Sequence, residues 1–440
     1  MRQPGDLIVD DRSDLVFHGR SSKRPYLAAV PLIAALVVVA GIGALGPRPG
    51  SHSAGQLPGG PDQASASDSN EGTAQASAPD PSPSWLVAGS TPEPYAEPAP
   101  NVGLARLEVG DGSIRSSEAP AGYPSIAFSG HQVFVGTGAD VTRIDFDETG
   151  APELIASMDP GYVVGALATT GTKVIVLEAP LPEVCGDTGC PTTAGPDWEV
   201  LILNPDGSDG RIAETFPQSS AVDRLITPLL AAADGQWAVS RPDLRPGHTG
   251  STVIEVHSDS GQLLWSTSTR SDVLKLTLGG SRLAAVLGDP SEGESRSVAV
   301  ADAAHRDLAP GASVSWDASI SPDGRYMAWD SGGCVVTQDG IGNRQVCPPD
   351  DRSETLRAFA DPSVGTWGNG PMTVWAIDTV DGHWLGISAP AALANDVWLA
   401  NGGSPSWFGV QGSLLVWASF TKTGIEIHEV DLSIADLTIG

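Results

Sequence analysis

Cysteine is the first residue type in this chain whose spacing suggests chemistry. The four cysteines form two close pairs, Cys185 with Cys190 and Cys334 with Cys347. Folding the second stretch about Gly340–Ile341 sets its two cysteines opposite each other, at a separation that a disulfide spans. We therefore predict a disulfide within each pair, the first one closing a small loop. The C-x4-C spacing of that first pair also suggests a metal, but no nearby histidine pair supports zinc.

Familiar catalytic patterns do not occur in the sequence. It contains neither the GxSxG turn of a nucleophilic serine nor the HExxH motif of a zinc peptidase. The eight histidines are scattered, and the carboxylates are too numerous to nominate one catalytic pair. We assign no catalytic, cofactor-binding or metal-binding residue and expect no cofactor. Three tryptophans are candidate contacts for a partner, with core packing as the alternative: Trp198 in a long insertion, and Trp384 and Trp407 in expected loops.

The charge of the chain limits its partners. The formal net charge is −29, and residues 1–46 are close to neutral, so the negative charge belongs to the remainder. An acidic body repels phosphate backbones, which argues against nucleic-acid binding. It also argues against the body lying flat on an anionic membrane surface.

An apolar segment near the N-terminus predicts the topology. Residues 25–46 carry no charge, and a helix of that length spans about 30 Å, the thickness of a bilayer core. Arg20, Lys23 and Arg24 precede it, so the positive-inside rule places residues 1–24 in the cytoplasm and everything after the span outside. A cleaved signal peptide is the alternative, although its apolar region is usually about 7–15 residues.

The next segment has the composition of a linker. Residues 47–100 are rich in Pro, Ser, Ala and Gly and hold few large apolar residues, so they cannot bury enough surface to fold. We predict a disordered tether with an r.m.s. span of roughly 40 Å. It would hold residues 101–440 at a distance from the bilayer.

Residues 101–440 show a repeat that predicts an all-β fold. A turn glycine followed by an apolar strand recurs at intervals of 41, 64, 45, 44, 46 and 42 residues, at Gly130, Gly171, Gly235, Gly280, Gly324, Gly370 and Gly412. About 40–45 residues is the length of one four-stranded propeller blade. The long interval contains an insertion at 178–200, the best candidate for a contact surface. We count seven blades, with six or eight open, and read 104–115 as a hairpin that completes the last blade or forms an extra one.

Two segments resemble known propeller repeats. The sequence SISPDGRYMAW (319–329) resembles the repeat of TolB-type, WD40-like propellers, in which a Ser-Pro-Asp-Gly turn precedes the second strand. The sequence VIEVHSDSGQLLWS (253–266) resembles the quinoprotein-type repeat, with Gly261 and Trp265 in matching places. These resemblances imply a bacterial propeller. The quinoprotein-type match occurs only once, and the chain has no adjacent Cys-Cys pair. We therefore do not expect a quinone cofactor.

The leading functional hypothesis is a membrane-tethered binding, sensing or scaffold module outside the cytoplasm. One propeller face would engage an envelope protein, a wall polymer or a small ligand. An extracytoplasmic enzyme, glycoside-active or quinone-dependent, is one alternative and requires clustered acids or a cofactor in the channel. A structural subunit of an envelope complex is the other.

Overall fold

Strands make up nearly all of the described chain, as the short alternating apolar runs predict. In the computed structural model, the only helical element among the described residues is one short 3-10 turn, η2 (Asp111–Ser113). No helix of that part is long and apolar enough to cross a membrane. The predicted tail, membrane span and linker, residues 1–100, lie outside it. The structure describes residues 104–119, 124–181, 197–217, 228–243, 245, 250–288, 296–308, 311–339, 342–348, 356–379, 382–399, 405–420 and 424–439.

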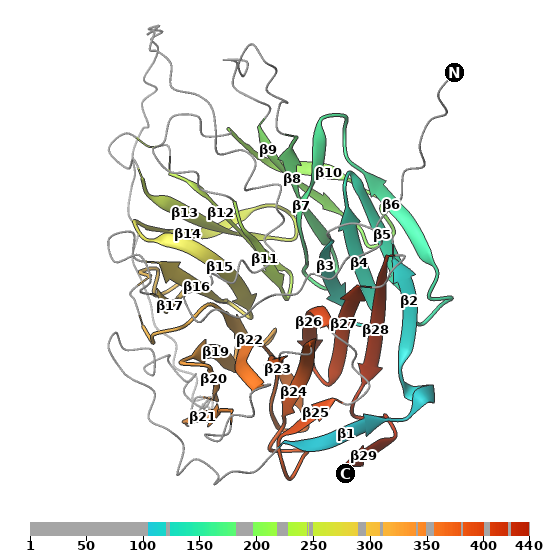
Figure 1. Cartoon of the computed structure of the whole chain (residues 1–440). Helices are drawn as coiled ribbons and strands as arrows, with labels where there is room; N and C mark the ends of the chain where they lie inside the picture. The colour runs from blue at the N-terminus through green and yellow to red at the C-terminus, as the bar shows by residue number, and fades with distance from the viewer. Residues whose placement is uncertain are drawn as a thin grey trace, which may run out of the picture.

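The strands form seven sheets arranged in a ring, as the blades of a propeller (Figure 1). The first blade contains β3 (Ser125–Ser129), β4 (Gln132–Thr137), β5 (Asp140–Asp145) and β6 (Pro152–Ser157). The second contains β7 (Tyr162–Thr169), β8 (Val174–Pro180), β9 (Trp198–Leu203) and β10 (Arg211–Phe216). The third contains β11 (Leu230–Ala233), β12 (Gln236–Pro242), β13 (Thr252–Ser258) and β14 (Leu263–Thr269).

The remaining four blades follow in chain order. The fourth has three described strands, β15 (Asp272–Gly279), β16 (Arg282–Gly288) and β17 (Arg296–Asp302). The fifth contains β18 (Ala318–Ile320), β19 (Met327–Ser331), β20 (Cys334–Gln338) and β21 (Asn343–Val346). The sixth contains β22 (Leu356–Trp367), β23 (Gly370–Thr379), β24 (Gly382–Ser388) and β25 (Val397–Leu399). The seventh contains β26 (Pro405–Gln411), β27 (Leu414–Phe420) and β28 (Ile425–Asp431).

Two N-terminal strands close the ring, but they do not form the predicted hairpin. Strand β2 (Arg115–Ala119) pairs with β28 and completes the seventh blade, but it lies, apart from Arg115, beyond the 104–115 segment for which this was expected. Strand β1 (Ala105–Val109) instead pairs in parallel with β25 and antiparallel with β29 (Leu437–Ile439). Each strand covers a sheet edge that would otherwise present unpaired backbone groups. The prediction failed because these partners lie at the far end of the chain.

Large apolar side chains fill the spaces between neighbouring blades. The tryptophans that recur after the turn glycines, Trp329, Trp375 and Trp417, are at most 1% exposed. Trp417 of the seventh blade shares a cluster with Leu385 of the sixth. Beside Trp375 there is no room for a side chain at Gly386, where a Cβ would lie 2.3 Å from the indole ring. Each sheet therefore depends on its neighbours to cover its faces.

The recurring glycines form the turn between the first and second strands in six blades. There the backbone has a positive φ, which glycine adopts without steric cost, at Gly130, Gly171, Gly235, Gly280, Gly324 and Gly412. The sixth blade differs from the prediction, because Gly370 begins β23 and the turn glycine, with a φ of 67°, is Gly368. The repeat and the count of seven blades are otherwise confirmed.

A disulfide bond joins Cys334 and Cys347, as the local pairing predicts. Strands β20 and β21 pair antiparallel, with Val335 opposite Val346. This register places the two cysteines one residue beyond that pair. The other cysteine pair, Cys185 and Cys190, lies outside the described residues, as do residues 182–196 of the insertion.

Candidate functional site: the central channel

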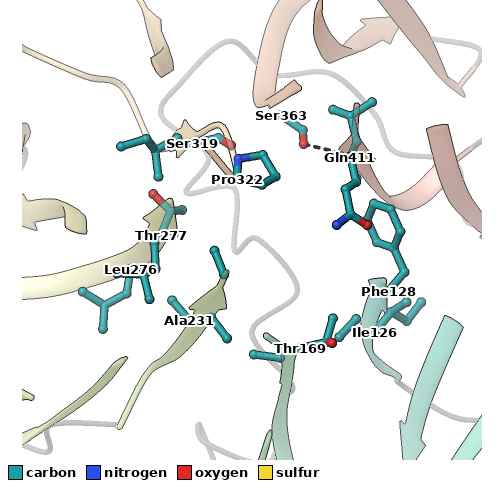
Figure 2. Close-up of a pocket in the computed structure, with 18 of the residues that line it drawn as sticks. Ile126, Phe128, Thr169, Ala231, Leu276, Thr277, Ser319, Pro322, Ser363 and Gln411 are labelled. Carbon is teal, nitrogen blue, oxygen red and sulfur yellow. Dashed lines mark hydrogen bonds between the residues drawn. The ribbon is translucent and has the colours of Figure 1, made fainter. Parts of the chain in front are cut away.

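A cavity of about 520 Å³ lies on the axis of the ring. It is lined by the first strand of every blade, so that all seven sheets contribute to one site (Figure 2). Its wall mixes apolar, aromatic and polar side chains, among them Ile126, Phe128, Thr277, Ser319 and Gln411. Concave sites of about 300–1,000 Å³ with a few polar groups are typical of small-molecule binding.

Serine hydroxyls link the innermost strands of neighbouring blades. The Leu167 backbone N–H donates to Ser125 Oγ at 2.8 Å, and the Val364 N–H donates to Ser319 Oγ at 3.4 Å. A third bond runs from the Val410 N–H to the Ser363 hydroxyl at 3.3 Å; Figure 2 shows this serine on the cavity wall. Backbone donors that face the axis are thereby satisfied. The wall of the cavity is consequently held in fixed register before any ligand binds.

A charged group from three consecutive blades projects into the cavity. Lys275 on β15 forms an ion pair with Asp317, which immediately precedes β18. Asp361 on β22 is hydrogen-bonded to Asp317 from the other side. Behind them, buried Asp330 on β19 accepts the backbone N–H groups of Trp316 and Asp317 at 2.9 and 2.7 Å. Asp330 thus fixes the backbone that carries Asp317.

The electrostatics of this group set its protonation. Although Asp361 is exposed to the cavity, desolvation by the surrounding blades raises its pKa to about 8, and the hydrogen bond and negative charge of Asp317 act in the same direction. Burial opposes ionisation of Asp317 too, but the ammonium of Lys275 and the hydrogen bond from Asp361 lower its pKa. Burial likewise opposes the charge of Lys275, and Asp317 overcomes it to raise the lysine pKa. At neutral pH the group therefore holds an ammonium, a carboxylate and a protonated acid.

The backbone at Asp361 is unusual. Its φ is 51°, in the left-handed region, and the pairing of β22 with β23 is irregular between Ala360 and Ser363. A non-glycine residue in this region costs of order 1–3 kcal/mol and is found preferentially at functional sites. A bulge of this kind re-aims a side chain out of the regular alternation of a strand. Here it brings Asp361 to the cavity and to Asp317.

The spacing of the two carboxyl groups bears on the enzymatic alternative. Asp317 and Asp361 are in direct hydrogen-bond contact. The acid pairs of glycosidases are separated by about 5–5.5 Å in retaining enzymes and about 6.5–9.5 Å in inverting enzymes. A pair in direct contact leaves no room for the water that an inverting enzyme places between its two acids. What it offers is a donor and an acceptor side by side, with the Lys275 ammonium as a second donor.

The three candidate tryptophans occupy different environments. Trp407 lies on β26, lines the cavity and contacts Phe128 edge to face, with ring centroids 6.1 Å apart. Trp384 lies on β24 and packs edge to face on Trp398 at 5.4 Å. Trp198 begins β9 and packs against the core between the second and third blades. The expectation that Trp384 and Trp407 lie on loops is wrong, and of the three only Trp407 lines the channel.

The charged group in the channel was not nominated from the sequence. Lys275, Asp317 and Asp361 are separated by 42 and 44 residues, each interval being about the length of one blade. They converge because the ring closes. One signal was present: Lys275 is one of four lysines in the chain and interrupts the apolar strand VLKLTLG. A charge on the innermost strand of a repeat must face the channel or a neighbouring blade.

Seven sheets stacked in a ring around a lined channel define this chain as a seven-bladed β-propeller protein. No protein-family model matches the chain, and no curated protein sequence matches it. Among solved structures, BamB from Moraxella catarrhalis is similar at 14% identity and a TM-score of 0.40, covering 74% of this chain and 90% of that one.

Two further propellers are similar at the level of fold. The β-propeller domain of the Trilobed protease from Pyrococcus furiosus has 8% identity and a TM-score of 0.46, covering 73% of this chain and 96% of that one. The β-propeller domain of Cps50 (Swd1) from Myceliophteria thermophila has 12% identity and a TM-score of 0.43, covering 72% and 100%.

Proposed function

We propose that this chain is a binding module whose propeller channel takes a small hydroxylated ligand, such as a saccharide unit of a wall polymer. The observation that carries the proposal is the group formed by Lys275, Asp317 and Asp361 in a cavity of about 520 Å³. At neutral pH it offers hydrogen-bond donors and an acceptor in fixed positions. A hydroxyl is both donor and acceptor, so a polyol can satisfy all three groups.

The aromatic side of the cavity supports the same ligand class. Phe128 and Trp407 line it from the first and seventh blades. A sugar ring has an apolar C–H face that packs on an aromatic ring, while its hydroxyls reach polar groups. The indole of Trp407 is held in place by its contact with Phe128. We assign Trp407 the packing role and the charged group the hydrogen-bonding role.

Binding can be tested by calorimetric titration of the full chain in detergent with mono- and disaccharides, including glucosamine and N-acetylglucosamine. We expect Trp407→Leu and Asp361→Asn to weaken the binding of the saccharide that wild type takes by at least about tenfold. Trp384→Leu is the matched control, because Trp384 is also half-buried on a strand but lies outside the cavity. Failure of the whole panel to bind, or equal loss in the control, would refute the proposal.

The location of the propeller forms a second part of the proposal. We propose that residues 25–46 anchor the chain in the cell membrane and that the propeller lies outside the cytoplasm. The uncharged segment and the basic residues before it support this. The disulfide between Cys334 and Cys347 supports an oxidising compartment. The orientation can be tested by fusing a reporter enzyme that is active only in the cytoplasm after residue 440. Reporter activity would contradict the proposed orientation.

A further inference from the structure

Three metal-ligating side chains meet at the interface between the second and third blades. Glu214 lies on β10, the outermost strand of the second blade, and Glu255 and His257 lie two residues apart on β13 of the third. Residues two apart on a strand point to the same face. Their ligand atoms all lie within 4.8 Å of one another. Two sheets therefore present one imidazole and two carboxylates to a common point.

The imidazole is aimed at the carboxylates across distances longer than a good hydrogen bond. His257 Nε2 lies 3.4 Å from Glu214 Oε2 and 3.9 Å from Glu255 Oε2. The side chain is 4% exposed, and Nε2 has no hydrogen-bond partner within the described part of the chain. A good N–H···O bond spans about 2.7–3.2 Å. Ligand atoms on a tetrahedral zinc, at about 2.0–2.2 Å from the metal, are instead roughly 3.3–3.6 Å apart.

The groups around the three side chains orient them as metal ligands are usually oriented. His257 Nδ1 faces the Gly261 carbonyl oxygen at 3.4 Å, so a proton on Nδ1 leaves the Nε2 lone pair directed at the carboxylates. The His257 ring stacks on Trp237 with centroids 4.1 Å apart and planes 7° apart. Arg241 holds Glu255 through two bonds, Nε to Oε2 at 3.1 Å and Nη2 to Oε1 at 2.6 Å.

A cation between the two carboxylates would relieve their mutual repulsion. Two carboxylates face each other across the blade interface, and Arg241 neutralises one of them. We propose that Glu214, Glu255 and His257 bind a divalent transition-metal ion of the zinc class, with water as the fourth ligand. One imidazole and two carboxylates form a ligand set that suits zinc. The Glu214 side chain is 23% exposed, which gives ion and water a route from solvent. Bound there, the ion joins the second blade to the third.

The seventh blade contains an internal control for this arrangement. His428 on β28 stacks on Trp417, with centroids 5.0 Å apart, and its Nε2 lies 3.7 Å from Glu426 Oε2, two residues earlier. Its Nδ1 bonds to Ser116 Oγ at 2.8 Å. Among the residues that the structure describes, no second carboxylate completes this site. The same Trp–His–Glu pattern thus occurs twice, and only the copy in the third blade has three ligands.

Zinc titration of the full chain tests the proposal. The protein, untagged and in detergent, is stripped with EDTA, desalted and titrated with ZnCl₂ in a calorimeter. Cys185→Ser and Cys190→Ser are introduced throughout, so that this cysteine pair cannot supply a thiolate site. We expect one zinc per chain. His257→Gln and Glu214→Gln should each weaken binding by at least about 100-fold, more than the loss of an outer-shell partner usually does.

Two controls separate a bound metal from a structural histidine. His428→Gln should leave zinc affinity unchanged, and Co²⁺ should give tetrahedral absorption bands without thiolate charge transfer. Far-UV circular dichroism establishes that each variant is folded. If His257→Gln does not fold, Glu214→Gln still tests the proposal, because the Glu214 side chain is partly exposed. Absence of zinc binding, insensitivity to Glu214→Gln, or an equal loss in His428→Gln would overturn the proposal.

Discussion

Replacing Asp361 by asparagine should remove a pH dependence of stability that the channel imposes on the fold. The pKa of Asp361 is about 8 in the folded protein and about 3.9 in an unfolded chain. The folded state therefore binds the proton more tightly, so the contribution to stability is fully present below about pH 4 and is lost as the pH rises to about 8. The asparagine amide would still donate to Asp317 and would not ionise.

The magnitude follows from the pKa difference and the accessibility of the group. Each pKa unit corresponds to about 1.4 kcal/mol, which gives an upper bound of roughly 6 kcal/mol. Asp361 is accessible from the cavity, and solvent screening reduces the effect. We expect Asp361→Asn to be about 1–2 kcal/mol more stable relative to wild type at pH 9 than at pH 5.

Urea denaturation of the full chain at pH 5, 7 and 9 measures this difference, with tryptophan fluorescence as the signal. Glu148→Gln, which removes a surface carboxylate in the first blade, is the control and should shift little with pH. A constant difference between Asp361→Asn and wild type at all three pH values would refute the proposed proton sharing in the channel.

Three further substitutions test the packing and closure of the ring. Gly386→Ala should destabilise the folded protein by several kcal/mol, because the alanine Cβ would lie 2.3 Å from the Trp375 ring. Thermal unfolding measures this effect, and an unchanged melting temperature would contradict the described packing. Arg115→Ala should lower the free energy of unfolding by about 3 kcal/mol, since it leaves the fully buried Glu429 without its guanidinium partner. Hydrogen exchange should rise first in β2 and β28, and a uniform rise over the chain would argue against closure of the ring there. Cys334→Ser should lower stability by about 2–4 kcal/mol through loss of its disulfide, and identical urea midpoints for oxidised wild type and variant would contradict this.

The fold was largely predictable because its signals are local and periodic. A turn glycine before an apolar strand, as at Gly324, reports on one hairpin at a time, and its recurrence gives the blade count. The Cys334–Cys347 bond was predictable for the same reason, because both strands of its hairpin are adjacent in sequence. The pairing of β1 was not, because its partners β25 and β29 lie about 300 residues away and no local pattern specifies them.

The sites were less predictable, because they form where separate blades meet. Lys275, Asp317 and Asp361 each look like an ordinary charge near a strand, and only closure of the ring brings them together. Glu214 and His257 meet across two sheets, so neither shows a ligand spacing along the chain. Trp407 was identified as a contact candidate and expected in a loop, but it lies on strand β26.

A crystal structure of the full chain soaked with the saccharide that binds most tightly in the calorimetric panel would test the central claim most directly. We expect the sugar to lie in the axial cavity, with hydroxyls within hydrogen-bond distance of Lys275 and Asp361 and one ring face on Trp407. A sugar bound elsewhere with the cavity filled only by water, or a cavity closed by its own side chains, would contradict it.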